Sequence, residues 1–112
     1  MVEKNSHSHI ISSIRKFTGL PERVRTTQSA YFDMMAWSLE KADVCDAIAK
    51  WIDEGKEVEE IVTKYASGHT GEPAYVMKPL LCGQVFYVKV SLPQDANGVE
   101  TLLIVSAHSD RR

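Results

Sequence analysis

Apolar and polar residues alternate most clearly in two segments near the end of the chain, residues 84–92 and 101–107. Within the first segment, Tyr87 and Lys89 alternate with large apolar side chains, which is the period of a strand with one buried face. The apolar set is Phe86, Val88, Val90 and Leu92. Between the segments lies PQDANG, which is rich in turn-forming residues. The pattern predicts a β-hairpin that holds Tyr87 and Lys89 on the face away from the core.

Apolar residues at steps of three and four predict helices in the first half of the chain. The first expected helix covers His9–Phe17, and the second begins at a cap on Thr26 or Thr27 and continues to Trp37. The third is capped by Ser38 and ends at Gly55. After residue 57 the period changes: residues 58–65 fit a strand or a final helical turn, and Ala74–Lys78 fits a strand. Helices followed by strands predict an α+β fold, with N-terminal helices packed on a small antiparallel β-sheet.

The chain has 112 residues, of which 44% are hydrophobic and 25% are charged. This size and composition predict one domain covering residues 1–112, of the soluble globular kind. No apolar run is long enough to cross a bilayer, so we expect no membrane association. No secretion signal is recognisable at the N-terminus, which favours a cytoplasmic protein. Cys45 and Cys82 then fit small core or near-core residues better than redox or metal groups.

The formal net charge of −2 gives no general attraction to nucleic acid. His7 and His9 stand two apart in a polar leader without further metal ligands, and they are better explained as surface residues. The sequence also contains no phosphate-binding glycine loop and no nucleophile elbow. We therefore expect no metal and no small-molecule cofactor.

Six polar residues of the strand half have the chemical types that cleave RNA without a metal. They are Lys64, His69, Glu72, Tyr87, Lys89 and His108. The reaction needs a base for the ribose 2′-OH, an acid for the departing 5′-oxygen, and cations for the charged phosphate. Histidine or glutamate can be the base, histidine or tyrosine can be the acid, and lysine or arginine supplies the charge. Tyr87 suits two roles, as an acid or as a ring on which a base stacks.

Five short segments in a fixed order resemble the MqsR toxins of bacterial toxin–antitoxin pairs. They are VRTTQSA at 24–30, VCDAI at 44–48, TKYASGHT at 63–70, GQVFYVKV at 83–90 and LLIVS at 102–106. The resemblance covers nearly the whole chain. It implies a RelE-like α+β fold and a ribosome-independent mRNA endoribonuclease. It also implies a cognate antitoxin protein as partner.

The resemblance also suggests residues for the site. The family tyrosine after GQV falls on Phe86 or, with one inserted residue, on Tyr87, and Tyr87 is favoured because Lys89 then also matches. The lysine after the final strand of the family falls at His108. A further family lysine falls near Glu60, so Lys64 would supply that charge from another position. A family glutamine falls near Glu72.

These observations lead to one leading expectation and two alternatives. The leading one is a toxin of a type II pair that cleaves mRNA, with His108, Tyr87, Lys89 and Lys64 as the catalytic group. RNA contacts are expected from Arg111, Arg112, Gln84 and His69. The first alternative is a non-catalytic relative that acts as a protein-interaction module, which the negative net charge, Glu60 and Glu72 favour. A transcriptional regulator is weaker, because no helix carries a cluster of basic residues at recognition spacing.

Overall fold

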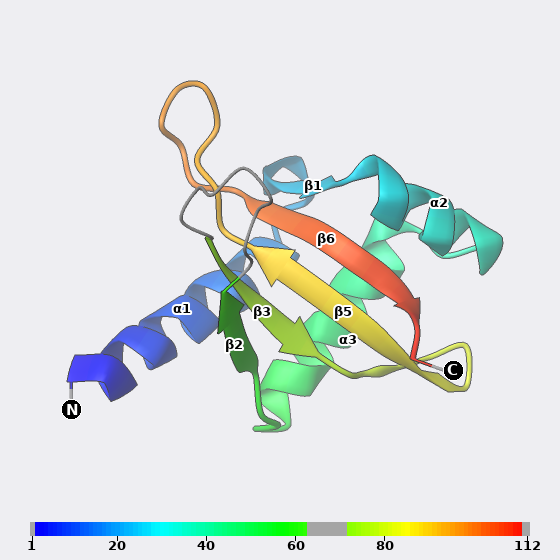
Figure 1. The fold of residues 1–112 in the computed structure, drawn as a ribbon, viewed down its shortest axis with the longest axis horizontal. Coiled ribbons are helices and arrows are strands. Elements are labelled where there is room, and N and C mark those ends of the chain that lie inside the picture. Colours follow the sequence, from blue (N-terminus) through cyan, green and yellow to red (C-terminus); the bar gives the residue numbers. More distant parts are fainter. Residues whose placement is uncertain (1, 63–71, 111–112) are drawn as a thin grey trace.

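Helices and strands do not separate cleanly along the chain, because a short strand lies between the first two α-helices (Figure 1). The computed structural model describes residues 2–62 and 72–110, with side chains from residue 7 onward. The helices are α1 (Val2–Thr18), the 3₁₀ helix η1 (Pro21–Arg23), α2 (Gln28–Ala36) and α3 (Lys41–Asp53). The strands are β1 (Val24–Thr26), β2 (Glu59–Val62), β3 (Pro73–Met77), β4 (Leu80–Leu81), β5 (Gln84–Ser91) and β6 (Leu102–Ser109). The α+β class is confirmed.

The sheet is mixed, so the expectation of a purely antiparallel sheet was wrong. Its strand order is β1-β6-β5-β3-β2, and β4 pairs with β5 beside this path. β1 runs parallel to β6, whereas the pairs β6–β5, β5–β3 and β3–β2 are antiparallel. The long return through α2, α3 and the central strands allows β6 to run alongside β1 in the same direction. This parallel pairing brings the N-terminal half of the chain to the hairpin.

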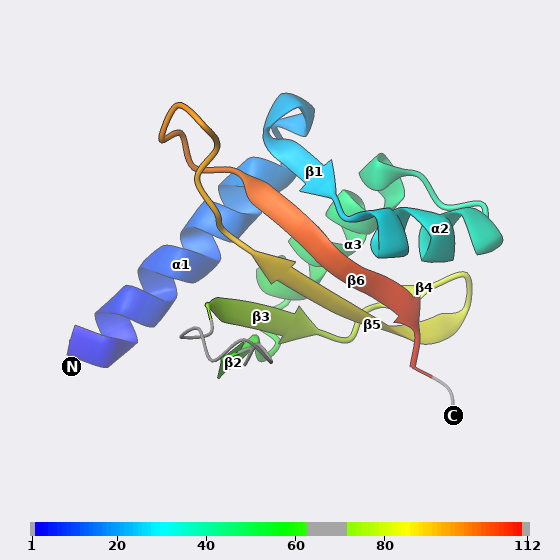
Figure 2. The ribbon, with the colours of Figure 1, turned by 45° about the horizontal axis from the view of Figure 1, so that its top comes forward.

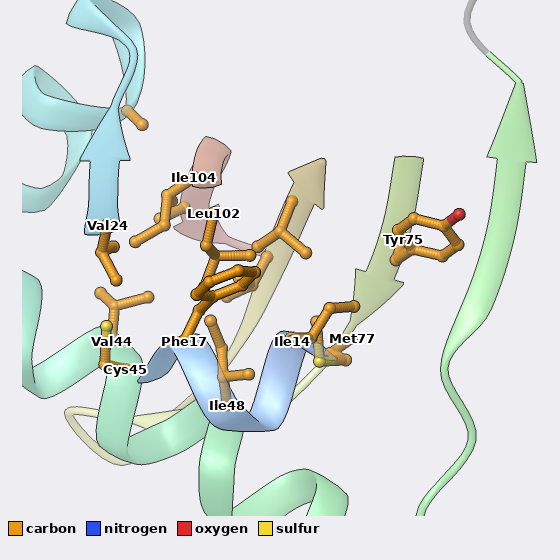
Figure 3. Close-up of a cluster of buried hydrophobic side chains, with 14 of the residues drawn as sticks. Ile14, Phe17, Val24, Val44, Cys45, Ile48, Tyr75, Met77, Leu102 and Ile104 are labelled. Atoms are coloured by element: carbon orange, nitrogen blue, oxygen red, sulfur yellow. The ribbon is translucent and has the colours of Figure 1, made fainter. Parts of the chain in front are cut away.

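Helices α1 and α3 cover one face of the sheet, behind β3, β5 and β6 in Figure 1, and α2 lies beyond β6 on the β1 side (Figure 2). Side chains from α1, α3 and the sheet meet between these layers (Figure 3). Ile14, Ile48, Leu102 and Ile104 are fully buried there. The apolar side of the hairpin strands therefore faces the helices, as the alternation predicted.

Local signals explain where the helices begin and end. The Thr27 hydroxyl accepts a hydrogen bond from the Ala30 amide at 3.1 Å, which confirms a threonine cap for α2. The expected Ser38 cap was wrong: Ser38 has φ = 56°, whereas a cap residue is extended, and Glu40 takes the position. The Glu40 amide donates to Oδ2 of Asp43 at 2.8 Å. Gly55, with φ = 73°, ends α3 as expected.

The hairpin was predicted correctly, with small changes in its limits. β5 ends at Ser91 and β6 extends from Leu102 to Ser109. The register shifts between Lys89 and Val90, which marks a β-bulge. The segment after residue 57, for which strand and helical turn were both open, contains β2.

Candidate functional site

Tyr87 and His108 lie directly opposite each other on β5 and β6. Their rings are stacked, with centroids 5.3 Å apart and planes inclined by 15°. Such cross-strand neighbours contact each other because opposed Cβ atoms in an antiparallel pair are close. The structure thus joins two of the sequence-predicted site residues into one flat aromatic surface.

A hydrogen bond indicates which His108 nitrogen carries the proton in the neutral ring. Nδ1 of His108 lies 3.1 Å from the carbonyl oxygen of Ser109. A carbonyl oxygen only accepts, so Nδ1 must be the donor. In the neutral imidazole the lone pair is then on Nε2, which can take a proton from a bound group. The His108 side chain is exposed, so a ligand can reach it.

Lys89 lies on the same face of the sheet as Tyr87, two residues along β5. Its cross-strand partners are Ser106 on β6 and Val76 on β3. The spacing of alternate strand residues places its Cα about 7 Å from that of Tyr87. Within residues 7–62 and 72–110, Lys89 forms no ion pair. No described carboxylate therefore neutralises its ammonium.

We call this side of the hairpin the outer face. It carries Tyr87, Lys89 and Ser91 on β5, and Leu103, Ser106 and His108 on β6. Tyr87, Lys89 and Ser106 are half-buried, so the backbone and neighbouring side chains restrict them. The arrangement offers a ring platform, a nitrogen base and a cation on one surface.

Phe86 and Gln84 belong to the opposite side of β5. Phe86 is fully buried and packs edge-on against Trp37, with ring centroids 5.3 Å apart. The hydroxyl of Ser109 donates to Oε1 of Gln84 at 3.2 Å. Period 2 places Gln84 with Phe86, so the structure does not bring it together with Tyr87. Of the two aromatic positions that follow GQV, only Tyr87 is accessible from the outer face.

Several predicted site residues lie outside the described residues: Lys64, His69, Arg111 and Arg112. Glu72 is described and exposed. Glu60 pairs with the core-facing Tyr75, and its Oε1 lies 4.0 Å from Nδ1 of His7 on α1. Glu60 therefore points toward α1 and not toward the outer face.

Sequence reasoning missed Arg25. The parallel register pairs Arg25 with Leu103, and the arginine is exposed. Paired residues share a face, so Arg25 extends the outer face beyond β6. Its place in the segment VRTTQSA was the signal that the sequence offered, because a strand of three residues is too short for its alternation to be recognised.

The two cysteines have different surroundings. Cys45 is buried, as expected, and burial raises the pKa of its thiol while the nearby Lys41 lowers it. Cys82 is exposed, so its prediction as a core or near-core residue was wrong. It lies in the turn between β4 and β5 with φ = 54°, and its Sγ is 3.9 Å from the Trp37 carbonyl oxygen. Both thiols are free.

Among residues 2–62 and 72–110, no group of three or more His, Cys, Asp or Glu side chains has the arrangement of a metal site. Within the same residues, no helix has the length and apolar character needed to cross a membrane. Comparisons of the chain with protein-family models, curated proteins and solved structures found no match.

Proposed function

We propose that this chain is a cytoplasmic endoribonuclease of the MqsR toxin type, which cleaves single-stranded mRNA on the outer face without a metal. One observation carries the proposal: the Tyr87–His108 stack lies on the same face of the hairpin as Lys89, two residues along β5 from Tyr87. Metal-free cleavage of RNA needs a base, an acid and a cation. His108 is suited to be the base and Lys89 the cation, and Tyr87 offers an acid or a ring on which a nucleobase stacks. The resemblance in segment order, with its RelE-like fold and its antitoxin partner, supports the same function.

In the proposed reaction, Nε2 of neutral His108 takes the proton from a ribose 2′-OH. The 2′-oxygen attacks the adjacent phosphorus, and the bond from phosphorus to the 5′-oxygen breaks. The departing 5′-oxygen takes a proton from the Tyr87 phenol if Tyr87 acts as the acid, or otherwise from water. The products are a 2′,3′-cyclic phosphate and a 5′-hydroxyl. Lys89 stabilises the additional negative charge on the phosphate in the transition state.

Tyr87 has two possible roles, and its geometry with His108 supports the stacking role. The planes of the two rings are nearly parallel, so a nucleobase placed on the tyrosine continues an existing stack. The acid role requires the phenol proton instead. Tyr87→Phe keeps the ring and removes that proton, whereas Tyr87→Leu removes both. Loss of cleavage in both variants indicates the acid role, and loss in Tyr87→Leu alone indicates stacking.

The principal experiment measures cleavage of a labelled single-stranded RNA by the purified protein in EDTA. We expect His108→Ala to reduce the rate by about 10²–10⁴-fold, the usual range for loss of a general base. His9→Ala is the matched control, because His9 is also exposed and lies on α1. Circular dichroism and thermal unfolding check that both variants fold.

Full activity of His108→Ala removes the role given to that residue. If the wild-type protein cleaves no single-stranded RNA and its induced expression does not arrest growth, the nuclease proposal is wrong. If an adjacent gene relieves growth arrest, its product is the expected antitoxin.

A protein-interaction module is the second candidate, and the surface of α2 favours it. Tyr31, Phe32 and Met35 are 50%, 58% and 55% exposed, although all three are large and apolar. They lie at steps of one, three and four residues, so they form one stripe on this helix. Exposed apolar stripes often bind partner proteins. An inactive relative would keep this surface and lose cleavage.

A further inference from the structure

The outer face is longer than the Tyr87–His108 pair, because β1 adds a cation at its other end. Arg25 pairs with Leu103, Leu103 pairs with Ser91, and all three share one row across the sheet. Figure 1 shows β1 beside β6 at the end of the hairpin remote from the C-terminus. The row therefore lies at the C-terminal end of β5, four residues from Tyr87.

The separation of the two ends follows from the strand geometry. Ser91 is four residues from Tyr87 along β5, which at about 3.3 Å per residue gives roughly 13 Å. Arg25 is one strand farther out than His108, a lateral step of about 4.8 Å. The two backbone positions are then roughly 14 Å apart. An extended single strand covers about 6 Å per nucleotide, near twice the 3.4 Å rise of a stacked strand.

The surface between these ends suits an RNA backbone. Along it lie Ser91, Ser106 and Lys89, which offer two hydroxyls and one ammonium. Within the described register pairs that join β1, β6 and β5 on this face, no residue is acidic. A phosphate chain laid along β6 thus meets donors and cations without a carboxylate directly beneath it.

Arg25 is free to take part in binding. Within residues 7–62 and 72–110 it forms no ion pair shorter than 4.0 Å. The positive charge of Arg25 helps to lower the pKa of Asp95. Oδ1 of that carboxylate already accepts hydrogen bonds from the backbone amides of Asn97 and Val99, at 2.8 and 2.9 Å. The neighbouring Arg23 differs, because its Nη1 donates to the Glu100 carbonyl at 3.2 Å.

We propose that Arg25 binds an RNA phosphate about two nucleotides from the bond cleaved at Tyr87 and His108. The outer face then takes a single strand of about four nucleotides that follows β6. This inference rests on the proposed function, since it extends the same surface. In this proposal, β1 helps to set how many nucleotides of the substrate the outer face binds.

The test measures affinity for non-cleavable 2′-O-methyl oligonucleotides of two, four and six residues, by NMR titration at low salt. We expect wild-type affinity to rise between two and four nucleotides. Arg25→Ala should weaken four- and six-residue binding by about 5–10-fold and leave the dinucleotide unchanged. The slope of log affinity against log salt should also fall by about 0.7, the value for one lost phosphate contact with a single strand.

Lys50→Ala is the charge-matched control, because Lys50 is exposed on α3 and the same unit of charge is lost. It should leave all three affinities unchanged. If the wild-type protein binds none of the oligonucleotides, the proposed function itself fails. If it binds them but affinity does not rise with length, or Arg25→Ala weakens all lengths equally or none, only the role of Arg25 is overturned.

Discussion

Replacement of Lys41 by methionine tests what holds β1, and therefore Arg25, in position. Nζ of Lys41 donates to the Val24 carbonyl at 2.9 Å and to the Pro21 carbonyl at 3.0 Å. The lysine stands at the start of α3, so these bonds tie that helix to η1 and β1. Methionine keeps most of the apolar stem and removes the ammonium. The substitution thus isolates the two hydrogen bonds.

The expected loss of stability comes mainly from one of the two carbonyls. In the variant, the Pro21 carbonyl still accepts a hydrogen bond from the Val24 amide. The Val24 carbonyl loses its bond from Lys41 in a partly buried position, so this loss costs more. A hydrogen bond from a charged donor contributes about 1.5–3 kcal/mol. Because solvent reaches this one, the low end applies, and we expect the free energy of unfolding to fall by about 1.5 kcal/mol.

Thermal unfolding provides the measurement. At about 2.1 cal/mol/K per residue, the unfolding entropy of 112 residues is about 0.24 kcal/mol/K, so the midpoint should fall by about 6 °C. Lys50→Met on the exposed side of α3 is the control and should change it by less than about 2 °C. A midpoint for Lys41→Met equal to that of the control would refute the reasoning, because the two bonds would then contribute nothing.

Two further predictions concern the backbone. Gly55 has φ = 73° and open space around it, so Gly55→Ala should cost only the backbone strain, about 1 kcal/mol or a 4 °C lower midpoint; an unchanged midpoint contradicts this. The pKa of Asp95 is lowered chiefly because the Val99 amide donates to it, an effect that burial opposes. Its stabilisation of the hairpin loop is therefore present above the ordinary aspartate pKa and is lost as pH falls through the lowered pKa. In an NMR titration of the wild-type protein, the chemical shift of the Val99 amide should change with a midpoint below the ordinary aspartate pKa of about 3.9. The Asp95→Asn variant should not show this change. A wild-type midpoint at or above the ordinary value contradicts the prediction.

The sequence predicted those parts of the fold in which periodicity is long enough to read. β5 alternates over eight residues, and α3 repeats its apolar face over thirteen. Tyr87 and Lys89 could therefore be placed on one face, but the residue of β6 that lies opposite Tyr87 could not be predicted. The stacked contact itself could not be predicted, because it depends on a bulge that shifts β6 by one residue.

The parallel strand and the cap of α3 were missed for different physical reasons. β1 has three residues and is defined by its pairing with β6, a contact between residues 78 positions apart such as Val24 and Leu102. No local pattern carries that information. The cap was misplaced because Ser38 is a good cap by residue type, yet the turn after α2 requires it to adopt a left-handed conformation. Tertiary packing decided both features.

The negative net charge of the chain is a weaker argument against RNA binding than the sequence alone suggests, because several of the carboxylates lie away from the outer face. Exposed Asp43 and Asp46 lie on α3, and Glu60 points toward α1. Asp110, two residues beyond His108, lies 3.6 Å from the ammonium of Lys78. The register also places Glu59 on the outer face, two strands from Lys89 and thus about 10 Å away. Exposed charges at that distance are largely screened at physiological salt, where the Debye length is about 8 Å. If RNA binds as proposed, its affinity should depend on Lys89 of β5 and Arg25 of β1 rather than on the total charge.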